Sequence, residues 1–197
     1  MTPLRIGVVV LENMIGPTLE TARLILRPPS SQDIDAYAAF MADEQSARHL
    51  GGVQERAMAW RSLATLTGAW TLNGFSMFSF IEKETGRWVG RGGPWLPEGW
   101  PGPEIGWGIV RSALRKGYAK EAATAAIDWA FTELGWTRII HCIEPANSAS
   151  IATARSLGSS LLEQGVRAPA PFTSTWDVYG QTRAQWYARQ DATDVGV

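Results

Sequence analysis

A glycine surrounded by basic residues is the feature of this sequence with the clearest chemical potential. Gly117 follows Arg115 and Lys116, precedes Lys120, and opens a segment with strong helical periodicity. The first N–H groups of a helix lack intrahelical partners and lie at the positive end of its dipole. A glycine at that point lets an anion approach the backbone closely. The pattern favours a phosphate or diphosphate site, although a basic loop before an ordinary helix would have the same composition.

Several other kinds of site are disfavoured. The loop lacks the Gly-Lys-Ser/Thr of a P-loop, and no Gly-x-Gly-x-x-Gly of a dinucleotide site is present. A net charge of -1 and the absence of a long Lys/Arg run disfavour nucleic-acid binding. Cys142 is the single cysteine, and His49 and His141 do not have the spacing of a helical ligand pair, so no metal site is expected.

Local patterning predicts the elements that must position the loop. We expect strands over residues 19–27, 75–82, 87–91, 104–110, 138–143, 161–164 and 175–180. We expect helices from the Ser30 cap to about Ala42, over 54–66 with Ala57, Trp60 and Ala64 on one face, from Gly117 to Gly135, and from the Asn147 cap to Leu157. Residues 92–103 are expected to form a loop over a site. This order of elements indicates an α+β fold with a mixed sheet.

The helix after Gly117 has the most regular pattern in the sequence. Its small and apolar residues form one stripe, which comprises Ala119, Ala122, Ala123, Ala126, Ile127, Ala130, Phe131 and Leu134. Gly135 is placed to end the helix in a left-handed conformation.

The chain has the length of one domain with extensions. We expect an N-terminal extension over 1–18, one domain over 19–188 and a C-terminal tail over 189–197. The apolar run at 4–11 is too short to span a membrane and lacks the cleavage site of a secretory signal. It is either an edge strand or a leader before an alternative start at Met14. We therefore expect a cytoplasmic protein without a membrane partner.

A set of segments in fixed order resembles a known family. These segments are residues 19–27, 104–107, 115–122, 147–151, Gly158 and 177–180. Together they resemble the GNAT superfamily of N-acetyltransferases, and most closely its ribosomal-protein alanine N-acetyltransferase branch. The resemblance implies a mostly antiparallel mixed sheet of about seven strands with about four helices. It also implies that the central strands at 104–110 and 138–143 splay apart to form the cofactor cleft.

The resemblance implies acetyl-CoA as the acyl donor. The expected cofactor contacts are Ile109, Arg115, Lys116, Gly117, Tyr118, Ala119, Lys120 and Asn147. Leu114 departs from the Gln or Arg of the family's loop pattern, so we expect the loop to bind through backbone N–H groups and nearby positive charge.

The same resemblance assigns the chemistry. Glu104 is expected to take a proton from an amine, directly or through water. Ser150 is the remaining candidate to protonate the leaving thiolate, because Ala154 stands where many members have a tyrosine. Its alternative role is that of a first-turn helix residue. A backbone N–H near Ile109 is expected to stabilise the oxyanion.

The acceptor is expected to be a primary amine, either a protein N-terminus or a small molecule. Glu98 could attract a cationic acceptor, and Trp95, Trp100 and Trp107 could form an aromatic wall, although core packing is the default for each. We expect a monomer or a homodimer. Two other readings stay open, namely a non-catalytic acyl-CoA-binding module and an interaction domain without a cofactor.

Overall fold

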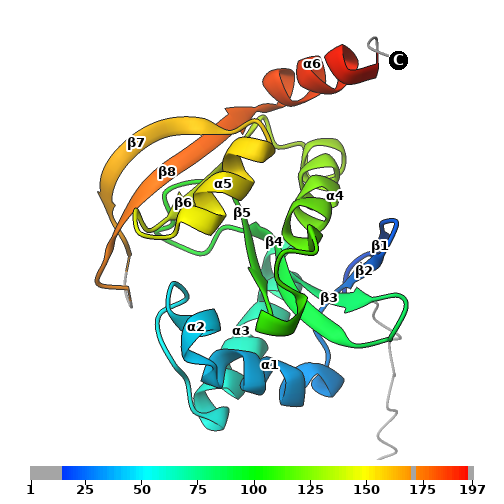
Figure 1. The fold of residues 1–197 in the computed structure, drawn as a ribbon, viewed down its shortest axis with the longest axis vertical. Helices are drawn as coiled ribbons and strands as arrows, with labels where there is room; N and C mark the ends of the chain where they lie inside the picture. The colour runs from blue at the N-terminus through cyan, green and yellow to red at the C-terminus, as the bar shows by residue number, and fades with distance from the viewer. Residues whose placement is uncertain (1–14, 170–171, 195–197) are drawn as a thin grey trace, which may run out of the picture.

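The computed structural model describes residues 15–169 and 172–194, which contain one sheet with strand order β1-β2-β3-β4-β5-β6-β8-β7 (Figure 1). The strands are β1 (Leu19–Glu20), β2 (Leu24–Arg27), β3 (Phe78–Glu82), β4 (Trp88–Trp95), β5 (Glu104–Ile109), β6 (Arg138–Ile143), β7 (Ser160–Arg167) and β8 (Thr175–Thr182). All neighbours pair antiparallel except β5 and β6, which are parallel. The predicted mixed, mostly antiparallel α+β sheet is confirmed, with eight strands in the described residues instead of about seven.

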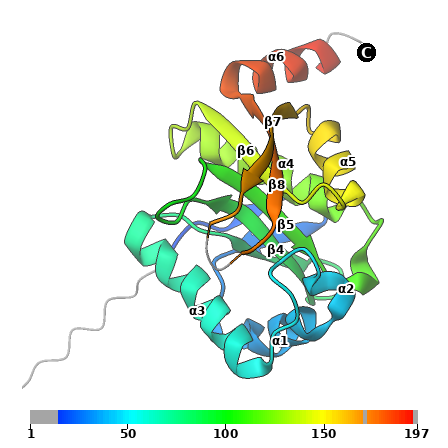
Figure 2. The same ribbon diagram turned by 90° about the vertical axis from the view of Figure 1, so that its left-hand side faces the viewer.

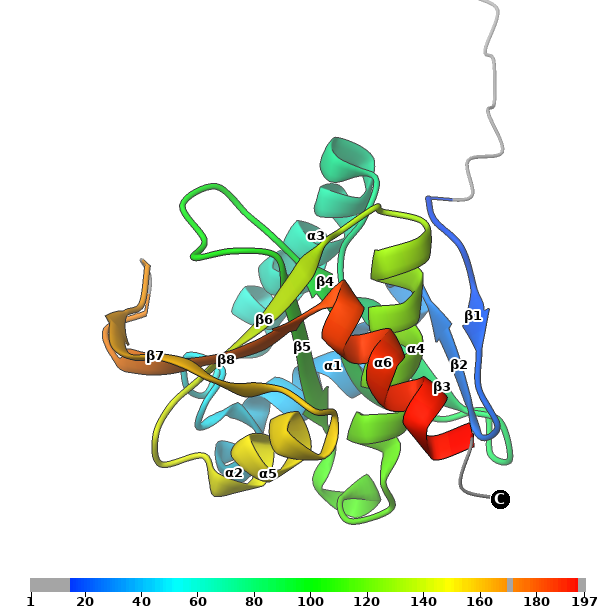
Figure 3. The same cartoon turned by 90° about the horizontal axis from the view of Figure 1, so that it is seen from above.

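Helices cover both faces of this sheet. They are α1 (Ile34–Ala42), α2 (Glu44–Ala47), α3 (Arg56–Asn73), α4 (Tyr118–Thr132), α5 (Ser148–Ser156) and α6 (Arg183–Asp194), with 3₁₀ turns at Ser31–Asp33 and Arg111–Ala113. The helices α1 to α3 pack together on one side, and α4 lies on the other with α5 and α6 (Figures 1 and 2). Seen from above, β7 and β8 continue the sheet beyond β6 (Figure 3). In residues 15–169 and 172–194, no helix is long and apolar enough to cross a membrane.

Helix α4 forms as its periodicity predicts. The stripe residues between Ala122 and Phe131 are almost fully buried, and they pack on apolar side chains of the central strands. The helix ends at Thr132. Gly135 follows with a φ of 66°, and the Trp136 N–H donates to the Ala130 carbonyl at 3.1 Å. Gly135 therefore terminates the helix in the left-handed conformation expected of it.

The first predicted strand is divided into two. Residues 19–27 form β1 and β2, which pair as a hairpin in place of one continuous strand. At the turn, the Thr21 N–H donates to the Leu24 carbonyl, and the Thr21 hydroxyl oxygen accepts the Leu24 N–H, both at 2.9 Å. The threonine side chain offers the backbone a local partner, which competes with an extended ladder.

Helix α3 buries a different face from the one predicted. Ala57, Trp60 and Ala64 face solvent, and Trp60 is 60% exposed. The buried positions are Ala59, Leu63, Leu66 and Trp70. The prediction ended the helix at Leu66, whereas the helix continues to Asn73 and stops before Gly74. The burial of Trp70 fixes the stripe, and Trp70 lay outside the window on which the prediction depended.

Two further elements were not predicted in full. Strand β4 continues through Gly92 to Trp95, so the first third of the expected loop at 92–103 is a central strand. Glycine is required there because a Cβ on Gly92 would lie 2.4 Å from the Gly106 carbonyl oxygen of β5. Helix α6 was also missed, although Trp186 is buried on α4, where its indole N–H donates to Asp128 at 2.6 Å. That contact is tertiary, so local patterning does not reveal it.

Candidate active site

The two parallel strands at the centre of the sheet meet at one point only. The single backbone register between β5 and β6 pairs Glu104 with Ile140, whose N–H donates to the Pro103 carbonyl at 2.9 Å. On its other edge β5 pairs fully with β4, with the Val110 N–H on the Val89 carbonyl at 3.0 Å. By the alternation of an antiparallel pair, Trp107 and Ile109 turn their peptide groups toward the β6 side. The predicted splay is therefore present, and it leaves peptide groups facing an opening.

Side chains replace the missing ladder at the mouth of the splay. The Glu104 Oε1 atom accepts the Cys142 N–H of β6 at 3.1 Å. The His141 Nδ1 atom lies 2.6 Å from the Ile105 carbonyl oxygen of β5. These contacts satisfy backbone groups that a continuous parallel ladder would pair with each other.

Glu104 is a buried carboxyl with few partners. Its side chain is 7% exposed, and its Oε2 atom accepts the indole N–H of Trp100 at 2.6 Å. Burial raises the pKa of Glu104 to about 7, an effect that the two hydrogen bonds and the positive charge of Arg91 only partly oppose. The carboxyl therefore titrates in the neutral range, where a general base is most effective.

His141 is a neutral structural residue. Burial lowers the pKa of His141 to about 4. Because the Ile105 carbonyl can only accept, Nδ1 carries the proton, and Nε2 accepts the hydroxyl of Ser159 at 3.0 Å. The Gln181 side-chain amide then donates to the Ser159 oxygen at 3.0 Å. This chain of hydrogen bonds holds the imidazole across the splay.

A cavity of about 540 Å³ opens beside Glu104, between the α1–α3 side and the ends of β5 and β6. It brings together seven of the residues to which the sequence analysis gave a role at the site: Glu104, Ser150, Asn147, Trp95, Trp100, Trp107 and Glu98. Glu98 is exposed, and the other six are buried or half-buried. Its volume is typical of a small-molecule site.

Aromatic rings form one wall of this cavity. Trp100 is the centre of the group, with ring centroids 6.4 Å from Trp95, 6.0 Å from Phe172 and 5.1 Å from Trp176. Trp107 lies apart from them, with its ring 4.9 Å from that of His141 and packed on the core around Ile105. Phe172 lies just before β8 and Trp176 lies within it, so they are far from Trp100 in the chain, and local patterning does not group them with it.

The first turn of α5 borders the same cavity. Asn147 caps the helix as predicted, and its side-chain oxygen accepts the Ser150 N–H at 3.2 Å. The Ser150 hydroxyl has no hydrogen-bond partner in the described part of the chain. Ala154, one turn further on, is fully buried. Ser150 is thus a half-buried hydroxyl that a ligand could use.

The predicted phosphate loop lies at the far end of β5 from Glu104. Gly117 is the N-cap of α4 with a φ of 82°, and no side chain caps the helix. The first N–H groups of α4, on Tyr118, Ala119 and Lys120, are therefore without a side-chain acceptor. Arg115 has a φ of 62°, the one positive φ outside glycine in residues 15–169 and 172–194. Such strain is commonly found where a loop is shaped for a ligand.

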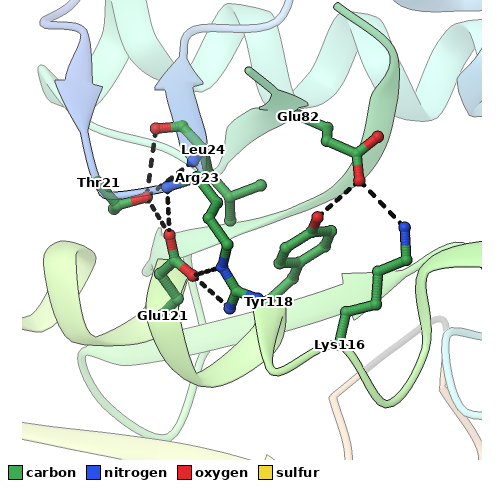
Figure 4. Close-up of polar contacts among 7 residues, drawn as sticks. All are labelled: Thr21, Arg23, Leu24, Glu82, Lys116, Tyr118 and Glu121. Carbon is green, nitrogen blue, oxygen red and sulfur yellow. Dashed lines mark hydrogen bonds and ion pairs between the residues drawn. The ribbon is translucent and has the colours of Figure 1, made fainter. Parts of the chain in front are cut away.

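Two of the predicted cofactor side chains are held by an acid on β3 (Figure 4). The Tyr118 hydroxyl donates to Glu82 at 2.6 Å, and the Lys116 ammonium lies 3.1 Å from the same oxygen. Hydrogen bonds from Thr85, Tyr118 and Lys116 lower the pKa of Glu82 to about 2. Glu82 therefore remains ionised and anchors the loop to the sheet.

Arg23 is a cation at this loop that the sequence did not single out (Figure 4). Its guanidinium lies 4.7 Å above the Tyr118 ring, and a Cβ on Gly117 would be 3.5 Å from its Nη2 atom. Glu121 of α4 holds Arg23 with an Nη2–Oε2 distance of 2.6 Å and also accepts the Thr21 hydroxyl at 2.6 Å. One signal could have identified Arg23, because residues 19–27 and Glu121 both lie in segments that resemble the family.

The cavity also has charged residues that were missed. His49 Nδ1 and Glu144 Oε2 lie 2.5 Å apart and join the segment after α2 to the end of β6. Arg91 of β4 lines the cavity as well. A lone arginine between Gly90 and Gly92 on a predicted strand was the signal that could have found it. In the described residues, no group of three or more His, Cys, Asp or Glu could hold a metal ion.

Comparisons with known proteins agree with this geometry. Residues 23–160 match the family model of the acetyltransferase (GNAT) domain. The N-acetyltransferase p20 of Bacillus licheniformis, itself uncharacterized, is 32% identical over 143 residues, which are 71% of this chain and 80% of p20.

Solved structures of acetyltransferases share the fold. An acetyltransferase of Agrobacterium tumefaciens is 30% identical with a TM-score of 0.75, over 91% of this chain and 99% of that one. The ribosomal-protein-S5-alanine acetyltransferase of Vibrio fischeri has a TM-score of 0.67 at 16% identity, over 86% and 98% of the two chains. At that identity the second likeness concerns the fold alone.

Proposed function

This chain belongs to the GNAT acetyltransferase domain family and is an acyltransferase, and from that premise we propose that it moves acetyl from acetyl-CoA to a primary amine, with Glu104 as the base. The observation that carries the proposal is the Glu104 carboxyl itself. It lies at the mouth of the splay, in a cavity large enough for a small ligand, with a pKa of about 7. An α-amino group loses its proton at about pH 7.7–8, so a carboxylate of this basicity can take that proton close to neutrality.

The proposed step is a direct transfer. The amine nitrogen forms a bond to the thioester carbonyl carbon while one of its protons passes to Glu104, directly or through water. The C–S bond then breaks, and the leaving thiolate receives a proton from the Ser150 hydroxyl, which solvent later reprotonates. The products are an N-acetyl amide and free CoA. Peptide N–H groups of Trp107 or Ile109, which face the opening, are placed to stabilise the oxyanion.

The start of α4 fits the diphosphate of acetyl-CoA. Its uncapped N–H groups lie at the positive end of the helix dipole, and Gly117 leaves space above the backbone. Arg115 and Lys120 are exposed beside it. Lys116 and Tyr118 point to Glu82, so we assign them to holding the loop rather than the phosphate. Arg23 is a further cation beside Gly117, where Glu121 holds it.

The pantetheine arm would lie along β5. The unpaired side of this strand runs from the loop after Ile109 back toward Glu104, and Asn147 and Ser150 lie on the opposite side of the opening. Extended backbone donors and acceptors of this kind suit the amide groups of the arm. The acetyl group would then reach the cavity beside Glu104.

The acceptor class within the family is a separate question. The ribosomal-protein alanine branch would imply a protein N-terminus, and the cavity would equally admit a small amine. Both acceptors present a primary amine to Glu104, so the proposed chemistry is the same for each.

The test combines binding and turnover. Calorimetry with acetyl-CoA measures cofactor affinity, and thiol release measures acetylation of a panel of peptides, polyamines, aminoglycosides and amino acids. We expect micromolar to millimolar binding and turnover of at least one acceptor. Absence of heat would contradict the cofactor assignment, whereas binding without turnover of any amine would favour an acyl-CoA-binding module.

A further inference from the structure

Arg91 is a cation of the acceptor cavity without an anionic partner. It extends from the middle of β4 and lines the cavity together with Glu104 and the aromatic wall. Its Nε atom is buried and makes no hydrogen bond, and its Nη1 atom contacts only the thioether sulfur of Met77. In the described residues no carboxylate lies within 4 Å of it.

Such a group is costly unless a ligand uses it. A thioether is a weak acceptor, and a buried N–H without a partner keeps its full desolvation cost. A guanidinium has a planar fork of donors that matches a carboxylate. The unmet hydrogen-bonding capacity of Arg91 therefore points to an anionic group on the molecule that enters the cavity.

The remaining charges of the cavity define the rest of that molecule. Glu104 lines the same cavity, and the charge of Arg91 is close enough to lower the pKa of its carboxyl against the effect of burial. Two other acids line the cavity: Glu144, which is already paired with His49, and Glu98, which is exposed. Away from the exposed Glu98, the cavity thus presents one unpaired cation and one carboxyl, which together match a zwitterion.

We propose that the acceptor is a free amino acid, whose carboxylate binds Arg91 and whose amine faces Glu104. The rings of Trp95, Trp100, Phe172 and Trp176 provide an apolar wall beside Glu104, so a large apolar side chain is favoured. This inference rests on the proposed function. The step is the same: the amine nitrogen gains acetyl, one proton goes to Glu104, and CoA leaves as the thiol.

Charge complementarity disfavours the other acceptors. A peptide with a free N-terminus carries an amide where the amino acid has its carboxylate, so Arg91 would stay unpaired. A polyamine would bring further positive charge toward the guanidinium. Both can present an amine to Glu104, but neither uses Arg91.

The test compares phenylalanine with phenylalaninamide by thiol release at saturating acetyl-CoA. The two acceptors differ only in the carboxylate, and the amine of the amide is the less basic, so chemistry alone would favour the amide. We expect the wild-type protein to prefer phenylalanine by about 10-fold or more in kcat/KM. A preference for the amide or for an N-terminal peptide would overturn the inference and leave the proposed function standing. No turnover of any amine would count against both, and calorimetry with acetyl-CoA would then show whether cofactor binding survives.

Variants of Arg91 provide a second test of the inference. Arg91→Met should lower kcat/KM for phenylalanine by about 10- to 100-fold and change that for the amide by less than about 3-fold, with acetyl-CoA affinity unchanged. Arg91→Lys, which keeps the charge without the fork, should give an intermediate loss. Arg87→Met, which removes an exposed arginine on the same hairpin, is the matched control and should behave as wild type. An equal loss for both acceptors would show that Arg91 is structural. If Arg91→Met does not fold, the preference of the wild-type protein between phenylalanine and phenylalaninamide still tests the inference.

Discussion

Replacing Glu104 with glutamine should lower activity. It should also raise the stability of the protein relative to wild type when the pH rises above neutral. The carboxyl is 7% exposed, and burial raises its pKa from 4.5 to about 7. In the unfolded chain it ionises near 4.5, so between these values the folded protein binds more protons than the unfolded chain. Stability supplied by this group is therefore present at low pH and lost as the pH rises toward 7. Glutamine cannot ionise and does not have this dependence.

The magnitude follows from the two pKa values. The difference between 4.5 and about 7, at about 1.36 kcal/mol for each pH unit, corresponds to about 3 kcal/mol. Most of it, about 2–3 kcal/mol, falls between pH 5 and pH 8. Loss of an acceptor for Trp100 or Cys142 in Glu104→Gln costs a further amount that does not depend on pH, so it cancels when the two pH values are compared.

The assay is urea denaturation of wild type and Glu104→Gln at pH 5 and pH 8. The free energy of unfolding of the variant, minus that of wild type, should be about 2–3 kcal/mol larger at pH 8 than at pH 5. Glu84→Gln, an exposed glutamate in the turn between β3 and β4, is the control and should show no such difference. In parallel, kcat/KM of wild type should rise through an inflection near pH 7, and the variant should lose this inflection and about 10²- to 10⁴-fold in rate.

The raised pKa of Glu104 and its role as a base can be refuted separately. A variant whose stability tracks wild type at both pH values would show that Glu104 is not a buried group with a raised pKa. A variant with the expected stability but wild-type turnover at all pH values would refute its role as a base.

The other predictions concern the two helix starts of the site. Gly117→Val should lower the free energy of unfolding in urea by about 1–2 kcal/mol, because valine resists the left-handed φ of 82°. It should also weaken acetyl-CoA binding measured by calorimetry. An unchanged dissociation constant would count against the loop as the diphosphate site. Asn147→Ala should cost about 1 kcal/mol through the lost cap on the Ser150 N–H, and equal stability would mean that water caps as well. Ser150→Ala should lower kcat by about 10-fold, less than most acid catalysts, because a thiolate already leaves readily. Its acetyl-CoA affinity should not change, and a rate equal to wild type would remove Ser150 from the chemistry.

Sequence patterning predicted the parts of this molecule that depend on local physics. The α4 stripe, the Asn147 cap and Gly135 each follow from neighbours in the chain, and all three are confirmed. The order of elements was sufficient for the α+β fold with a mixed sheet, whereas the splayed pair was expected from the family resemblance. Resemblance to a family added the expected residues of the cavity, whose roles remain proposals.

The features that were predicted wrongly or missed depend on contacts between distant segments. The buried face of α3 is set by Trp70, and α6 is held by the contact between Trp186 and Asp128. Arg23, which lies beside Gly117, comes from a strand far earlier in the chain. No periodicity encodes such pairs, so only the folded chain shows them.

The join between β5 and β6 has a single backbone register, fewer than most other joins of the sheet. Strands paired over several residues are linked mainly by peptide groups, which all residues share, so substitutions leave the pairing largely intact. Beyond the bond between Ile140 and Pro103, Glu104 and His141 link β5 to β6 with their side chains. Because these links depend on the identity of two side chains, a single substitution at Glu104 or His141 can alter how the two halves of the sheet are joined.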